Sequence, residues 1–138
     1  MGNLLDRAVR IAVQTCLAVQ PGEEVVVVAD EPMLDLGRRF FLASRRAGGS
    51  VALAALPPLR KSKPDLPTTV AAMMKSADVL VLVTSVSISH TEARRAACRE
   101  GARAISLPAV TEDTLKRAVD VDYRFVQERS RKIADIFT

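Results

Sequence analysis

Side chains that could do chemistry are concentrated in one short stretch, VTSVSISHTEARR, residues 83–95. The candidate substrate-cleft residues in it are Thr84, Ser87, Ser89, His90 and Thr91. His90 is the single histidine of the chain, and an imidazole can transfer protons near neutral pH. Hydroxyls can hold a polar group, and the unpaired N–H groups of a helix start favour an anion. One interpretation is therefore a loop that holds the polar end of a substrate or reaches toward a neighbouring domain's active site.

The same residues also fit a purely structural role. Ser89 and Glu92 have the S-x-x-E spacing of a capping box, which satisfies the first backbone N–H groups of a helix. In this interpretation His90 is a partly exposed residue of the first helical turn. Ser87 and Ser89 lie too near His90 in the sequence for a nucleophile and base, and the GxSxG pattern is absent. We therefore assign no catalytic residue within the chain.

A second polar stretch, ADEPM at 29–33, follows the apolar run VVVVA. Asp30 is the remaining cleft candidate. A pyrophosphate needs glycines through which backbone N–H groups can approach, whereas two carboxylates stand here, and both GxGxxG and GxxxxGK[ST] are absent. The third apolar run ends in Thr84 with no phosphoacceptor aspartate. These features argue against nucleotide binding and phosphotransfer, so no cofactor-binding residue is assigned.

Potential metal ligands are not grouped in the sequence. The carboxylates Asp30, Glu31 and Asp35 are equally well explained as acids at or near the start of a helix. Cys16 and Cys98 fall on separate predicted helices without a CxxC pair, so neither a disulfide framework nor a thiolate site is indicated. We expect no metal site within the chain, and a reducing, cytoplasmic location.

Apolar periodicity predicts alternating helices and strands around these residues. Strands are expected at 25–28, 51–56, 79–83 and within 102–108. Helices are expected over 4–19, between Pro32 and Gly48, around 70–74, from Ser89 to Glu100, after a cap at Thr111 or Asp113, and along a stripe from Val126 to Phe137. The proline-broken stretch 57–67 is expected to be a surface loop.

This alternation predicts a single α/β domain over residues 1–138. The fold expected is a Rossmann-like, doubly wound parallel sheet of about four strands in the order 2-1-3-4, with helices on both faces. Continuous β-branched runs support parallel strands covered on both sides. In that order the winding reverses between the first and third strands, where ligands bind beyond the carboxyl ends. Residues 30–32 and 84–90 form the two sides of the predicted crevice.

Composition excludes several classes of partner. The net charge is +4 with a pI near 9.5, yet there is no Trp and a single Tyr, so a base-stacking platform is missing and we expect no nucleic-acid partner. The longest apolar runs are far shorter than the roughly 20 residues of a membrane helix, so no membrane span is expected. A helix that reaches the last residue without a stop signal suggests the N-terminal part of a longer protein.

Three segments carry a resemblance to a known family: QPGEEVVVVAD, MMKSADVLVLVTSVSISHTEARRAACREGARAISLP and TEDTLKR. Together they resemble the amino-terminal half of the aminopeptidase T or leucyl-aminopeptidase-like metallopeptidases, over essentially the whole chain. The most specific part is the pattern S-x-S-H-T-x-A-R-x-x-A…G-A-R-x-x-S-x-P. Its residues here are Ser87, Ser89, His90, Thr91, Ala93, Arg94, Ala97, Gly101, Ala102, Arg103, Ser106 and Pro108.

The resemblance implies an enzyme that removes N-terminal residues from peptides, with zinc or cobalt held by Glu, His and Asp ligands of a carboxyl-terminal domain. None of those ligands can be placed on this sequence, so the chain alone is expected to be inactive. Its implied partners are that catalytic domain, a peptide substrate for the joined protein and further copies in a homo-oligomer. The alternatives are the same domain of a non-haem iron dihydroxypyridine-type ring-cleaving dioxygenase, and a non-enzymatic Rossmann-like ligand-binding module.

Overall fold

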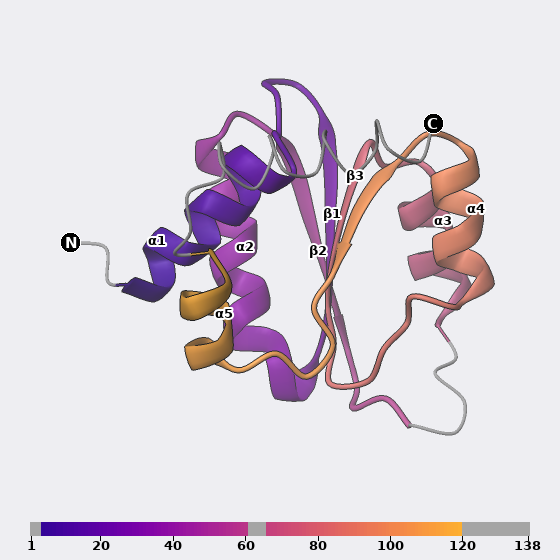
Figure 1. Cartoon of the computed structure of the whole chain (residues 1–138). Helices are drawn as coiled ribbons and strands as arrows, with labels where there is room; N and C mark the ends of the chain where they lie inside the picture. Colours follow the sequence, from indigo (N-terminus) through magenta and orange to yellow (C-terminus); the bar gives the residue numbers. More distant parts are fainter. Residues whose placement is uncertain (1–3, 61–65, 120–138) are drawn as a thin grey trace, which may run out of the picture.

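A computed structural model describes residues 4–60 and 66–119 of the protein (Figure 1). The predicted helix along Val126–Phe137 lies outside the described residues. The described residues alternate helices and strands, as the apolar periodicity predicted.

Four parallel strands form the central sheet. They are β1 (Glu24–Asp30), β2 (Ser50–Leu56), β3 (Val79–Val83) and β4 (Arg103–Ser106). Their order is β2-β1-β3-β4, and in the register of the sheet Val27 lies opposite Leu53 on one side and Val81 on the other. The predicted parallel sheet and its 2-1-3-4 order are confirmed.

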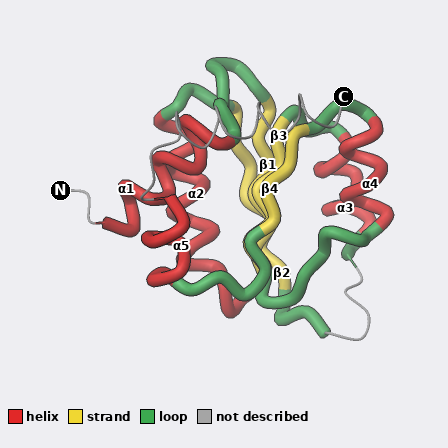
Figure 2. The backbone as a smooth tube through the Cα atoms, in the orientation of Figure 1, coloured by secondary structure: helices red, strands yellow, loops and turns green. Residues whose placement is uncertain are grey.

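Helices cover both faces of the sheet (Figures 1 and 2). One layer holds α1 (Leu4–Ile11), α2 (Leu34–Arg46) and α5 (Glu112–Val119), and the other holds α3 (Thr68–Lys75) and α4 (Glu92–Arg99). Within the described ranges, none of the helices has both the length and the hydropathy that crossing a bilayer requires.

The two faces of the sheet contribute side chains to two separate hydrophobic cores, because successive side chains along a strand point to opposite faces. Val25 and Val27 of β1 pack with α1 and α2, around the fully buried Phe40. Val26 and Val28 pack with α3 and α4, around the fully buried Met74. All five residues of β3 are buried, which explains why that strand reads as a continuous apolar run.

The first helix ends earlier than its periodicity predicted. After Ile11 the chain forms one π-helical segment, η1 (Ala12–Cys16), in which the Leu17 N–H donates to the Ala12 carbonyl at 2.9 Å. Ala18 then takes a left-handed φ of 49°. The prediction of a helix through residue 19 was wrong, because this exit from the helix brings both Leu17 and Val19 into the core.

A glycine sets the distance between α2 and the sheet. A Cβ built on Gly37 would lie 2.6 Å from the Ala29 Cβ and 3.6 Å from Leu53 Cδ1, whereas carbon atoms pack at roughly 3.5 to 4 Å. The backbone of α2 therefore approaches β1 closely, just before Asp30.

An ion pair ties the opposite, amino-terminal edge of the sheet together. The Arg103 guanidinium of β4 donates to both carboxylate oxygens of Glu23, at 2.9 and 2.7 Å, and its Nε donates to the Leu17 carbonyl at 3.2 Å. The bidentate hydrogen bonds from Arg103 lower the pKa of Glu23 below its usual value. The start of β4 is thereby fixed to the turn before β1.

We predict that Gly37→Ala lowers the free energy of unfolding by about 1 to 2 kcal/mol. The added methyl overpacks the helix against the strand, and this cost exceeds the gain of about 1 kcal/mol in helix propensity. Urea unfolding measures the loss. Adding Ala29→Gly removes the opposing methyl, so the double variant should show favourable coupling, and strictly additive losses would contradict the close approach.

Candidate functional site

A buried carboxylate organises the carboxyl-terminal edge of the sheet. Asp30, the last residue of β1, is 0% exposed. It accepts a hydrogen bond from the Ser85 N–H at 2.8 Å, a second from the Ser85 hydroxyl, and a third from the Leu59 N–H at 3.3 Å. A buried carboxylate is tolerable only when such donors replace its water. Asp30 thus joins the ends of β1 and β3 and the loop after β2.

This environment decides what Asp30 can do. A carboxylate has about four acceptor positions, and three are used within the protein. Because the group is also shielded from solvent, it positions its neighbours and is not placed to take a proton from a substrate or to ligate an ion. The sequence analysis expected a cleft-lining side chain here, and the structure puts that side chain beneath the edge.

The loop after β3 is anchored from below. The buried Thr84 hydroxyl donates to the Val86 carbonyl at 2.5 Å, and the Thr84 carbonyl accepts from the Ala109 N–H at 2.8 Å. Ile88 is fully buried in the core between the sheet and α3 and α4. With these points fixed, the exposed side chains of Ser87 and His90 stand on a defined backbone.

Three hydroxyls form a connected row across this edge. The Ser87 hydroxyl donates to Ser89 Oγ at 3.3 Å, and the Ser89 hydroxyl donates to Ser106 Oγ at 2.7 Å, at the end of β4. Arg94 Nε holds the Ser89 carbonyl at 2.6 Å. The row can donate and accept hydrogen bonds at once, which suits a polar ligand end such as an amine or amide.

The start of α4 differs from the predicted capping box. Thr91 is the N-cap residue, and its Oγ1 accepts from the Arg94 N–H at 3.3 Å while donating to the Ile88 carbonyl at 2.7 Å. The prediction of Ser89 as the cap was wrong by two residues, because Ser106 takes the Ser89 hydroxyl. The later helix starts as one of the two predicted alternatives, since the Thr114 N–H donates to Thr111 Oγ1 at 3.1 Å.

His90 is exposed, and no hydrogen bond joins its ring to another of the described residues. A general base in a hydrolytic triad needs a nucleophile on one ring nitrogen and an orienting acceptor on the other. Among the described residues neither the nucleophile nor the orienting acceptor is in place. His90 can therefore contact a ligand, but it is not positioned as a general base.

The metal implied by the family resemblance does not fit the residues of this part. Within residues 4–60 and 66–119, no three His, Cys, Asp or Glu side chains lie close enough together to hold a metal ion. No reaction step is therefore assigned to a metal on these residues.

The structure brings together only some of the predicted cleft residues. Ser87 and Ser89 meet in the hydroxyl row, Thr84 and Thr91 are engaged in backbone hydrogen bonds, and Asp30 lies below. The sequence analysis placed Ser85 in the crevice loop and Ser106 in the resemblance motif, but selected neither as a cleft residue. Ser85 lies just after the third predicted strand, and Ser106 lies near the end of the fourth. Because the carboxyl ends of parallel strands share one edge of the sheet, these positions were the sequence signal that could have identified both serines.

An open parallel α/β sheet with a polar switch-point edge is the class of domain defined here. No protein-family model matches the chain, and no curated protein matches its sequence. The structure of 2,5-dihydroxypyridine dioxygenase from Pseudomonas putida KT2440 is similar over 79% of this chain and 36% of that chain, with a TM-score of 0.59 and 13% identity. This similarity shows a shared fold.

Wild-type AmpT from Thermus thermophilus is similar over 84% of this chain and 41% of that chain, with a TM-score of 0.48 and 13% identity. The chain therefore spans between 36% and 41% of the length of these two structures.

We predict that Asp30→Ala lowers the free energy of unfolding by about 2 to 4 kcal/mol, because it strands three partly buried donors. The neighbouring Glu31→Ala removes an exposed carboxylate and should change stability by less than about 0.5 kcal/mol. Urea unfolding of both variants makes the comparison. Equal small effects would show that the Asp30 hydrogen bonds do not hold the edge.

A second pair of variants tests the start of α4. Thr91→Ala should cost about 1 kcal/mol, because it removes the side chain that caps the helix. Ser89→Ala should cost less, since the Ser89 hydroxyl bonds to another hydroxyl at a half-exposed position. Thermal unfolding compares the stability losses of the two variants. A larger loss for Ser89→Ala would contradict the Thr91 cap and support Ser89 as the N-cap residue of the S-x-x-E capping box.

Proposed function

We propose that this chain is the site-shaping α/β domain of a longer, metal-dependent aminopeptidase of the aminopeptidase T or leucyl-aminopeptidase-like class. In this role it borders a cleft whose metal ligands come from polypeptide outside the sequence. The observation that carries the proposal is the hydroxyl row Ser87–Ser89–Ser106, which joins the loop after β3 to the carboxyl end of β4.

The contacts join the separate parts of the motif that carries the resemblance. Ser89 and Ser106 are 17 residues apart in sequence and hydrogen-bonded in the structure. The arginine of the same motif, Arg94, holds the Ser89 carbonyl. The motif residues therefore meet at the carboxyl edge of the sheet, where ligands bind in folds of this class. This supports a role for the motif in ligand binding, in addition to its role in starting α4.

The residues of this chain would act by binding and orientation. The free amino terminus of a peptide is an ammonium donor, and the hydroxyl oxygens of the exposed Ser87 and the half-exposed Ser89 offer acceptors for it. The exposed His90 follows Ser89 in the sequence, and in this role its ring would contact a substrate amide. Water activation and carbonyl polarisation are left to the polypeptide that supplies the metal.

The first test uses this chain alone with leucine p-nitroanilide in the presence of Zn²⁺ or Co²⁺. The expected result is no release of nitroaniline above the metal-only background. Metal-dependent turnover that is removed by a chelator would contradict the proposal, because it would place a complete reaction centre on these residues.

The second test requires the coding sequence downstream of codon 138. In the joined protein, Ser106→Ala is expected to raise KM for the leucyl substrate several-fold while kcat and the melting temperature stay unchanged. Ser76→Ala is the matched control, because among the described residues the Ser76 hydroxyl donates to α3 carbonyls alone. An unchanged KM for Ser106→Ala would remove the hydroxyl row from the cleft.

A second candidate is favoured by the fold comparison. The similarity with a TM-score of 0.59 is to a dihydroxypyridine dioxygenase. The second candidate is therefore the alternative implied by the resemblance, the same domain of a non-haem iron, ring-cleaving enzyme of that class. Downstream ligands decide between the two, because a Glu and His set fits the peptidase and a His, His and Asp set fits the iron enzyme. A stop codon after Thr138 would favour the non-enzymatic ligand-binding module.

A further inference from the structure

A hollow surface lies on the helical layer formed by α1 and α2, away from the hydroxyl row. It has a volume of about 910 Å³ and is bordered by the two helices and by Glu112 at the start of α5. We call it the α1–α2 groove, and its arginines are Arg7, Arg10, Arg38, Arg39 and Arg46.

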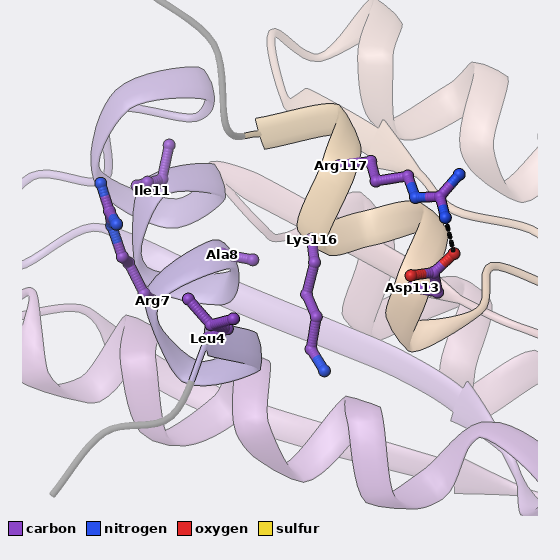
Figure 3. Close-up of a pocket in the computed structure, with 7 residues that line it drawn as sticks. All are labelled: Leu4, Arg7, Ala8, Ile11, Asp113, Lys116 and Arg117. Atoms are coloured by element: carbon purple, nitrogen blue, oxygen red, sulfur yellow. Dashed lines mark ion pairs between the residues drawn. The ribbon is translucent and has the colours of Figure 1, made fainter.

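A smaller hollow of about 230 Å³ continues from it between α1 and α5. The two hollows share Leu4 and Arg7. Figure 3 shows Leu4 and Ala8 facing α5, and Lys116 reaching into the space between the helices. The concave surface thus runs along two sides of α1.

The surface carries most of the excess positive charge of the chain. Seven Arg and Lys side chains and four Asp and Glu side chains line the two hollows, a net charge of +3, while the whole chain has +4. Three of the four acids are paired on the surface itself, as Arg39 with Asp6 at 2.5 Å, Arg38 with Asp35 at 3.8 Å and Arg117 with Asp113 at 3.2 Å.

Three guanidinium groups in the groove remain available for a partner. Arg7, Arg10 and Arg46 are exposed and form no ion pair with any of the residues that the structure describes. Guanidinium groups bind carboxylates in a bidentate manner, and arginine is enriched in protein interfaces.

Apolar anchors accompany the charges. Leu4 is 66% exposed and Leu42 is 44% exposed, and these are the exposed large hydrophobic side chains found among the described residues. Both line the α1–α2 groove. Leucines within a concave surface between two helices favour the apolar face of a third helix.

We propose that the α1–α2 groove binds an acidic amphipathic helix of a partner protein. The leucines of such a helix contact Leu4 and Leu42, and its flanking carboxylates pair with Arg7, Arg10 and Arg46. A lipid bilayer is a less suitable partner, because a flat membrane contacts protruding side chains and this surface is concave. A nucleic acid offers no apolar face to the exposed Leu4 and Leu42, and among the described residues no aromatic side chain lines the groove for base stacking.

The test measures binding of a fluorescent 18-residue peptide with leucines at i, i+3, i+4 and i+7 and glutamates on both flanks. Its helicity is checked by circular dichroism. A peptide of the same composition in scrambled order, an 18-nucleotide oligothymidine and vesicles of phosphatidylcholine with phosphatidylserine are measured in parallel. The amphipathic peptide should bind at least tenfold more tightly than the scrambled one.

The double variant Arg10→Glu/Arg46→Glu should weaken binding at least tenfold. Arg45→Glu/Arg95→Glu makes the same charge change on exposed residues outside the groove, one of them on α2 itself, and should leave binding within twofold. Leu42→Ser should also weaken the peptide complex. Circular dichroism and thermal unfolding confirm that each variant is folded.

Four results would overturn the proposal. They are no peptide binding, equal binding of the scrambled peptide, tighter binding of the oligonucleotide or vesicles, and an equal effect of both double variants. Sedimentation of the protein alone adds a fifth, because self-association abolished by Arg10→Glu/Arg46→Glu would assign the groove to a second copy.

Discussion

A single buried carboxylate determines the form of the edge on which the account depends. Asp30 has no solvent exposure, so its charge must be compensated by protein donors. Those donors come from Ser85, 55 residues later in the sequence, and from Leu59. Because removing any of them leaves a buried charge short of partners, the ends of β1 and β3 and the loop after β2 are held as one unit. The hydroxyl row stands on that unit.

The described residues place two different surfaces on two different parts of the fold. The switch-point edge is lined with neutral hydroxyls at the carboxyl ends of the strands, whereas the α1–α2 groove is rich in guanidinium groups and lies on the helical layer. Neutral hydroxyls suit a small polar ligand, and arginines with exposed leucines suit a protein surface. The hydroxyl row and the α1–α2 groove share no residues, so the two proposals can be tested independently.

The sheet was predictable from the sequence, because β-branched runs such as Val25–Val28 have few alternatives to a covered parallel strand. Details that depend on contacts between residues far apart in the sequence could not be predicted. Ser89 has the spacing of a helix cap, but Ser106 captures its hydroxyl and Thr91 takes its place. Asp30 stood at the predicted crevice, yet the donors that compensate its burial come from Ser85 and Leu59, which no local pattern connects to it. The π-helical exit after Ile11 likewise keeps an apolar spacing close to that of an ordinary helix.

The central claim is that the Asp30 hydrogen bonds hold the candidate site in a fixed form. Amide hydrogen exchange of the Ser85 N–H, followed by NMR, tests it most directly. The account predicts that this loop amide exchanges as slowly as the amides of β3, through global unfolding alone. Exchange at the rate of an open surface loop would contradict it, since the edge would then not be organised in solution.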